Sequence, residues 1–512
     1  MKKILSFLVI ALVALIAFST DVKAAEVSGE EGLEAIFNET EETVKLLNDI
    51  TVNNEIKVTD KKILDLNGKT LTLNKNLIVN GGELTVTGNG KITTSVADPL
   101  ICVKAGSSLV LKNGIFESTT YYGATLQLFG DTVVDNLKTK VTIEKDAKVS
   151  GNYAVLISQN SSNLAYGVEL DVYGTVTGIT GNNGWKDGSF AIYTNGNIQA
   201  TTGNVPVINI YPSAILSASA GSTGNANKDS APAIFAAGYA NWNIEGGTFT
   251  GTEALSIKSG KFDITGGIFN ANGLFVKSLE PNGNGAEATG SAISITSNSG
   301  YSRKIDISIK DAQVTSENGY AILETITNAQ ESSLKSMKII NGDFSGKEGS
   351  VLVENTDNIG KFIEGGVFSS DVEDYTVDTL SSVKDGDTFY IGNLNSIVLK
   401  DTKNGAIKAN LQEAVKGQTV ELTIAPEAGY ETDTIKVYDE NNNQIDVINN
   451  RFVMPDSKAY VEVTFKTVAL VGEKDDTPKT GSLDISLYVC ISIIVLSLVS
   501  IVAVKKTRCF DR

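Results

Sequence analysis

The chain contains no histidine and very little cysteine, and both absences restrict its chemistry. Its 512 residues include three cysteines, of which Cys490 and Cys509 lie in or beyond a C-terminal apolar segment. Histidine and cysteine are common zinc ligands, so a Cys/His metal site is excluded. The remaining Cys102 has no disulfide partner outside that segment, and its apolar neighbours predict a small buried core residue.

Basic residues and proline are also scarce. Lys and Arg number 43 against 60 Asp and Glu, which gives a net charge of −17 and a pI of about 4.7. Phosphate binding needs clustered Lys and Arg, so this balance argues against nucleic acid as a partner. Only 8 prolines accompany 48 glycines. With many β-branched residues, this mixture predicts short strands separated by Gly/Asn turns.

The N-terminus has the order of a secretory signal peptide. Lys2 and Lys3 precede an apolar run over residues 4–18, and short side chains lead up to Ala25. The alternative is a first transmembrane helix, but the run is shorter than the roughly 20 residues that a span needs. Residues 1–24 are therefore predicted to be a cleaved signal peptide.

The C-terminal residues 481–512 follow a short motif and contain an apolar run and a basic end. The motif is Thr477-Pro478-Lys479-Thr480-Gly481. The run over residues 485–504 carries no charge and is long enough to be a transmembrane helix. The Lys and Arg residues after it are expected to stay on the cytoplasmic side.

This order resembles the sorting signal of Gram-positive surface proteins, a pentapeptide ending Pro-x-Thr-Gly. In that family a sortase cysteine attacks the Thr–Gly bond, here between Thr480 and Gly481, and passes the threonine carboxyl to a peptidoglycan amine. The resemblance implies a membrane-anchored precursor, an extracellular cell-wall location, and sortase and peptidoglycan as partners. Thr477 stands where the commonest family pattern has leucine. The sortase class therefore stays open, with a permanently membrane-held form as the alternative.

A short pattern recurs between residues 48 and 392: an apolar residue, any residue, Gly or Asn, Gly, any residue, then Phe. Clear copies end at Phe116, Phe249, Phe269, Phe344 and Phe368. The spacing of 20 residues between Phe249 and Phe269 is typical of a β-solenoid.

These copies predict an all-β fold with a right-handed parallel β-helix over residues 25–392. In each copy an apolar residue points inward, and a Gly-Gly or Asn-Gly corner tolerates positive φ. Coils stacked about 4.8 Å apart would pair their backbones and align the phenylalanines in a column. At about 22 residues a coil, roughly fifteen coils are expected. The region resembles the pectate-lyase-like β-helices of Gram-positive surface proteins, notably at residues 61–73.

Two other segments complete the predicted organisation. Leu33 and Phe37 at helical spacing predict a helix over residues 29–38 that covers the open end of the first coil. Residues 393–467 alternate like strands, and their "P-x-x-G-Y" and "F-x-M-P" segments resemble the divergent internalin B-repeat family. In that family the module is a small β-rich spacer or adhesion unit without known catalysis. Residues 468–480 are expected to be a polar linker that ends in the sorting motif.

The β-helix fold also carries polysaccharide lyases and glycoside hydrolases, so a wall-anchored enzyme of this kind is the alternative function. Asn355-Thr356-Asp357 matches one part of a polygalacturonase-like pattern, but the chain has no histidine. Arg303 and the acidic residues 371–374 are interpreted as parts of turns. Residues 439–446 begin like a calcium loop but lack its Gly and Glu, which favours a hairpin turn. No catalytic, metal or cofactor residue is predicted.

Aromatic residues in polar loops are the candidate ligand contacts. Trp185 lies in the glycine-rich loop 181–189, and it could stack on a sugar ring, as could Tyr121 and Tyr122. Trp242 is a weaker candidate. The alternative is that each aromatic ring anchors its own loop. The sequence as a whole predicts a monomeric, wall-anchored adhesin or ligand-binding platform for glycans or for proteins of a host or neighbouring cell.

Overall fold

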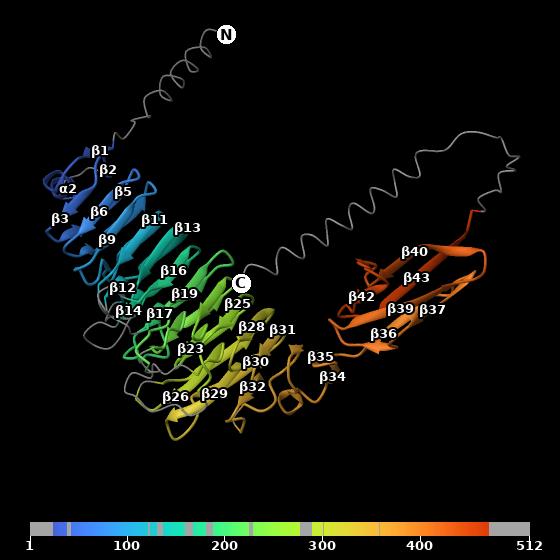
Figure 1. The fold of residues 1–512 in the computed structure, drawn as a ribbon. Coiled ribbons are helices and arrows are strands. Elements are labelled where there is room, and N and C mark those ends of the chain that lie inside the picture. Colours follow the sequence, from blue (N-terminus) through green and yellow to red (C-terminus); the bar gives the residue numbers. More distant parts are fainter. Residues whose placement is uncertain are drawn as a thin grey trace, which may run out of the picture.

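The computed structural model describes most of the chain between residues 24 and 469. The described residues are 24–37, 42–120, 123–130, 137–158, 167–180, 188–224, 229–276, 289–300, 302–357 and 359–469. They form a long stack of parallel coils followed by a second group of strands (Figure 1). The predicted all-β fold and parallel β-helix are confirmed. In this described part, no helix has the length and apolarity that crossing a membrane requires.

Each typical coil gives one strand to each of three parallel faces. The first face contains β2 (Thr43–Leu46), β5 (Lys61–Asp65), β8 (Glu83–Thr87), the first parts of β11 (Ser108–Ser118) and β13 (Thr139–Gly151), β15 (Val168–Val172), β18 (Val207–Ile210), β21 (Asn241–Ile244), β24 (Gly260–Ile264), β27 (Ile305–Ile309) and β30 (Leu334–Ile339). The second face contains β3 (Ile50–Val52), β6 (Thr70–Leu73), β9 (Lys91–Thr94), the later parts of β11 and β13, β16 (Thr175–Gly178), β19 (Ile215–Ala218), β22 (Thr248–Gly251), β25 (Ile268–Ala271), β28 (Ala312–Ser316), β31 (Gly342–Gly346) and β33 (Gly366–Phe368).

The third face is a separate sheet beside the longest loops. It contains β4 (Ile56–Val58), β7 (Leu77–Val79), β10 (Ile101–Val103), β12 (Ala124–Phe129), β14 (Tyr153–Ser158), β17 (Phe190–Thr194), β20 (Ile234–Ala236), β23 (Leu255–Ile257), β26 (Ile293–Asn298), β29 (Tyr320–Asn328) and β32 (Gly349–Val353).

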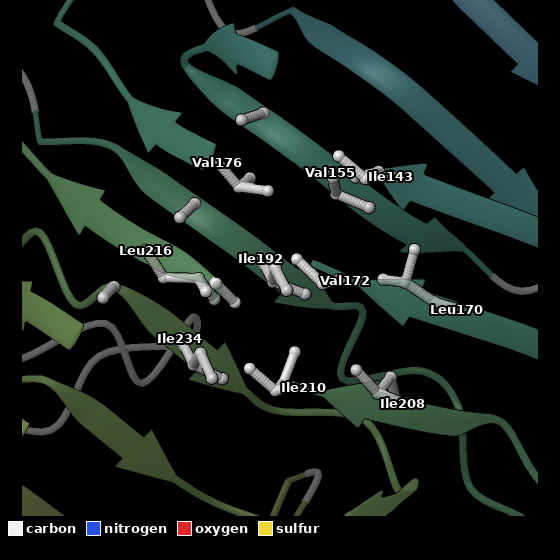
Figure 2. Close-up of a cluster of buried hydrophobic side chains, with 14 of the residues drawn as sticks. Ile143, Val155, Leu170, Val172, Val176, Ile192, Ile208, Ile210, Leu216 and Ile234 are labelled. Atoms are coloured by element: carbon white, nitrogen blue, oxygen red, sulfur yellow. The ribbon is translucent and has the colours of Figure 1, made fainter. Parts of the chain in front are cut away.

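Inward side chains of the three faces meet in one continuous core. On the first face Val172 pairs in register with Ile210, and Ile210 pairs with Ile244. Figure 2 shows aliphatic side chains from all three faces converging, among them Val176 and Ile192. All five are fully buried. One coil alone could not bury these side chains, so stacking creates the core.

The phenylalanines of the repeat stack in pairs along the second face. The rings of Phe249 and Phe269 lie 4.4 Å apart at 6°, and those of Phe344 and Phe368 lie 5.0 Å apart at 11°. The corner residue Gly267 has a φ of 116°, and a Cβ there would lie 3.2 Å from the Phe269 ring. Both conditions favour glycine, because other residues rarely adopt this φ and a Cβ would crowd the ring. The phenylalanines thus share one column as predicted, but aliphatic residues such as Val314 separate the two stacked pairs.

The coils vary in length more than the repeat spacing predicts. Ile244 pairs with Ile264, 20 residues later, whereas Ile264 pairs with Ile309, 45 residues later. The third face has eleven strands in the described part of the chain, so the expectation of roughly fifteen coils was too high. Long loops beside the third face lengthen a coil without adding a rung to the stack.

Both ends of the stack are covered. At the N-terminal end, helix α2 (Glu30–Phe37) buries Leu33 and Phe37, as its sequence spacing predicts. Strand β1 (Ala25–Val27) pairs with β2 beside it. After the short 3-10 helix η1 (Glu373–Tyr375), the hairpin of β34 (Ser381–Asp385) and β35 (Thr388–Gly392) pairs antiparallel with β33 and ends the parallel register.

The strands after the hairpin have a hydrophobic core of their own. One sheet has the order β38 (Glu413–Ala414), β36 (Asn395–Leu399), β43 (Ala459–Thr467), β40 (Tyr430–Tyr438) and β41 (Gln444–Ile445). The other has the order β37 (Gly405–Ala409), β39 (Thr419–Pro426) and β42 (Arg451–Val453). Val420, Phe452 and Val461 are buried between them.

Candidate functional site

A polar groove opens where strands β26 and β29 extend beyond the rest of the third face. Its volume is about 970 Å³, and its lining residues are Asn298, Ser299, Ser302, Thr327, Ala329, Gln330, Glu331 and Ser333. Hydroxyl and amide groups dominate this lining, and Glu331 is its charged member. Such a lining offers hydrogen-bond donors and acceptors to a hydrated polar ligand rather than an apolar slot.

Short hydrogen bonds fix the rim of the groove. The backbone N–H of Asn298 donates to Ser302 Oγ at 2.8 Å, and the N–H of Gly300 donates to Asn298 Oδ1 at 2.9 Å. On the opposite side the N–H of Ser333 donates to Ser297 Oγ at 2.8 Å. The first two bonds shape the turn after β26, and the third ties neighbouring coils together at the site.

A buried carboxylate lies behind the groove. Glu324 has no exposed surface, although its position on β29 belongs to an inward column that is apolar in most coils. It accepts hydrogen bonds from Ser332 Oγ at 2.6 Å, from Asn355 Nδ2 at 3.0 Å, and from the N–H groups of Glu354 and Asn355 at 3.1 Å. A carboxylate with this many donors is well compensated for burial.

This contact also accounts for Asn355-Thr356-Asp357, the fragment that matched part of a hydrolase pattern. The Asn355 amide holds Glu324, and Thr356 accepts turn hydrogen bonds from Ile359 and Gly360 at 3.0 Å. Asn355 thus has a structural partner on the neighbouring coil.

Two further charged side chains are buried on the third face. Lys258 is 1% exposed, donates to Thr296 Oγ1, and places its ammonium 6.0 Å from the centroid of the Phe235 ring. Glu253 has no exposed surface and accepts from the N–H of Thr289 at 2.6 Å and from its hydroxyl at 2.8 Å. The sequence offered no signal for either burial, because the partners Thr296 and Thr289 are distant in sequence.

An aromatic cluster lies on the outer side of the third face, and sequence reasoning missed it. Tyr153 stacks on Phe190 with centroids 5.5 Å apart, and Phe190 stacks on Phe235 at 5.1 Å. Tyr193 lies 5.2 Å from Phe235. Phe190 and Phe235 are buried, so the cluster is a small satellite core rather than an open stacking surface. The register of β14, β17 and β20 brings these rings together from three coils.

The aromatic candidates named from the sequence do not form this cluster. Trp242 points into the core, where it is 1% exposed and stacks on Phe262 at 5.7 Å, so it is unavailable to a ligand. Trp185, Tyr121 and Tyr122 lie outside the described residues. The predicted signal peptide over 1–24 also lies outside the described residues, except for Ala24. So do the apolar run 485–504 and the sorting motif, which consists of Thr477, Pro478, Lys479, Thr480 and Gly481.

The turn predicted over residues 439–446 is present, Arg303 lies between β26 and β27, and the acidic residues 371–374 lead into the 3-10 helix η1. Arg303 donates its guanidinium to the carbonyl of Ser302 at 2.8 Å. Asp439 accepts from the N–H groups of Asn441 and Asn443 at 2.8 Å, and the Asn443 side chain also donates to it at 2.8 Å. These bonds, the Asn443 side chain foremost, lower the pKa of Asp439. Within the described ranges, no cluster of three or more Cys, Asp or Glu residues is arranged to hold a metal.

Cys102 is expected to resist thiol reagents in the folded protein. The residue is 4% exposed, and burial raises its thiol pKa above the ordinary value, so both access and thiolate are reduced. In a Cys490→Ser/Cys509→Ser variant at pH 8, iodoacetamide should label Cys102 more than about tenfold faster in denaturant than in buffer. Equal rates, read by mass spectrometry, would mean that β10 does not bury this side chain.

Comparison with known proteins gives this chain no relative. No family model, curated protein or solved structure matches it.

Proposed function

We propose that the protein is a cell-wall-anchored surface protein of a Gram-positive bacterium that binds a ligand outside the cell. The proposal takes residues 1–24 as an export signal and Thr480 as the point of attachment by a sortase to peptidoglycan. Residues 393–467 act as an internalin-like spacer between the wall and the β-helix. The β-helix serves as an adhesin or binding platform for a glycan or a protein of another cell.

The observation that carries the proposal is the uninterrupted stack of coils. It gives a single chain a long, stiff surface whose outward side chains do not have to hold the core together. The polar groove lies beside one face of that stack. Repeat proteins use such extended surfaces for binding, and the sequence motif after residue 469 supplies the means of attachment.

Attachment through Thr480 is tested with the full chain in a Gram-positive host. Muramidase digestion of the wall should release a peptide that ends at Thr480 and is linked to a wall amine, as read by mass spectrometry. Thr480→Ala should move nearly all of the protein to the membrane fraction, with residues 485–504 retained. Ser482→Ala, just outside the pentapeptide, is the matched control and should behave like the original chain.

Two results would contradict parts of the proposal. If the original chain always retains residues 485–504, sortase attachment is wrong although surface exposure can still hold. Cells that display the chain should bind components of a glycan array without cleaving them. Release of product from any polysaccharide would mean that the protein is a wall-anchored lyase or glycoside hydrolase and not only an adhesin.

A further inference from the structure

Five consecutive strands of the second face present an outer surface without charge. The strands are β16, β19, β22, β25 and β28, and their outward residues form two columns in register. We call this surface the neutral face. It consists of Thr175, Thr177, Ile215, Ser217, Thr248, Thr250, Ile268, Asn270, Gln313 and Thr315.

In the column that contains Ile215 and Ile268, a charged residue stands directly beyond each end of the neutral face, whereas the other column continues with Ser150 and Ser345. Lys148 pairs with Thr175 on one side, and Asp343 pairs with Gln313 on the other. Two coils earlier, Lys91 and Glu117 form an ion pair at 3.2 Å. The chain as a whole carries a net charge of −17. In the column of Ile215 and Ile268, the lack of charge is therefore local to these five strands.

The neutral face alternates apolar and hydrogen-bonding rungs. Ile215 is 50% exposed and Ile268 is 41% exposed, and Thr248 lies between them in register. With strands about 4.8 Å apart, an exposed isoleucine recurs about every 9.6 Å. In the neighbouring column Ser217 Oγ donates to Thr177 Oγ1 at 3.2 Å. Isoleucine side chains this exposed show that no described segment covers the surface.

We propose that the neutral face binds an uncharged polysaccharide that lies along the stacking axis. A sugar chain presents apolar C–H surfaces and hydroxyl groups in turn, which the isoleucine and threonine rungs can match. An uncharged chain brings no charged group that would lose its hydration on binding. A charged partner would lose hydration and gain no residue of opposite charge on this surface. The net charge of −17 on the whole chain also disfavours anionic polymers.

The size of the neutral face suits a short stretch of such a chain. Four intervals between five strands span about 19 Å, which accommodates several sugar units in extended form. The inference rests on the proposed function as a binding platform, and it names the ligand class and the surface that the platform uses.

The test uses the full-length chain in detergent micelles and sedimentation with insoluble cellulose, chitin and β-1,3-glucan. Soluble polygalacturonate is the anionic comparison. Ile215→Lys/Ile268→Lys should weaken binding to the neutral polymer that the original chain binds by about tenfold or more. The control is Ile115→Lys, which changes a 41% exposed isoleucine in the same column outside the neutral face. It should alter binding by less than about twofold.

Several outcomes would overturn the inference, and they can be told apart from failure of the proposed function. Unchanged binding by the double variant, with unfolding midpoints equal to the original chain, moves the glycan site elsewhere but leaves the platform intact. Binding only to polygalacturonate or only to proteins would show that the ligand of this surface is not an uncharged polysaccharide. Self-association in light scattering that the double variant abolishes would assign the face to a second copy of the chain.

Discussion

Replacing Phe269 with alanine is expected to lower the free energy of unfolding by about 4 kcal/mol. Phe269 is fully buried, and its ring stacks on Phe249 at 4.4 Å. Strands β22 and β28 hold the coils on either side at fixed spacing. The cavity left by the ring therefore cannot collapse without breaking backbone hydrogen bonds, which keeps the full cost of the cavity in the free energy of unfolding.

The measurement is hydrogen exchange together with denaturant unfolding. In a stack whose coils contact only their neighbours, the loss of protection should be greatest in the coils that adjoin Phe269. Ile268→Ala is the matched control, because Ile268 is adjacent in sequence but faces solvent with 41% exposure. It should change stability by less than about 1 kcal/mol. Equal losses at the two positions would mean that the inward register assigned to β25 is wrong.

Replacing Glu324 with alanine is expected to cost about 3 to 5 kcal/mol. The carboxylate accepts from Ser332, from the N–H of Glu354, and from the backbone and side chain of Asn355. All of these donors lose their acceptor together. Because Glu324 is fully buried, its removal also leaves a cavity where the carboxylate was.

The matched control is Glu331→Ala on the rim of the same groove. Glu331 is exposed, so its removal should change the free energy of unfolding by no more than about 0.5 kcal/mol. Circular dichroism during denaturant unfolding measures both variants. If Glu331→Ala is as damaging as Glu324→Ala, the buried hydrogen-bond cluster is not what stabilises this end of the stack. Asn355→Ala should fall between the two, because it removes one of the donors to Glu324.

The inward columns could be predicted from the sequence, because alternation and glycine corners are local patterns. The phenylalanine column and the helix over Leu33 and Phe37 follow from spacing alone. The candidate site could not be predicted in the same way. Lys258 and Glu324 are charged residues whose burial depends on hydrogen-bond partners from other coils, Thr296 for Lys258 and Asn355 for Glu324.

The groove is formed by β26 and β29, which extend further than most strands of the third face. Strand β29 has nine residues where β23 has three, and nothing in its alternation indicates where the pairing should stop. The lengths of β26 and β29 depend on each other through their shared backbone bonds. Such extensions are a property of the assembled sheet, so the sequence pattern of a single strand does not predict them.

The direction of the backbone hydrogen bonds has a mechanical consequence. Bonds between coils run along the stacking axis, so a load that pulls the two ends of the stack apart strains the bonds of one rung at a time. Rungs should then open in succession rather than all together. A coil such as that between Ile244 and Ile264, 20 residues long, would release about 70 Å of chain. Under tension the rod would act as an extensible tether that dissipates force in steps and rewinds when the load falls.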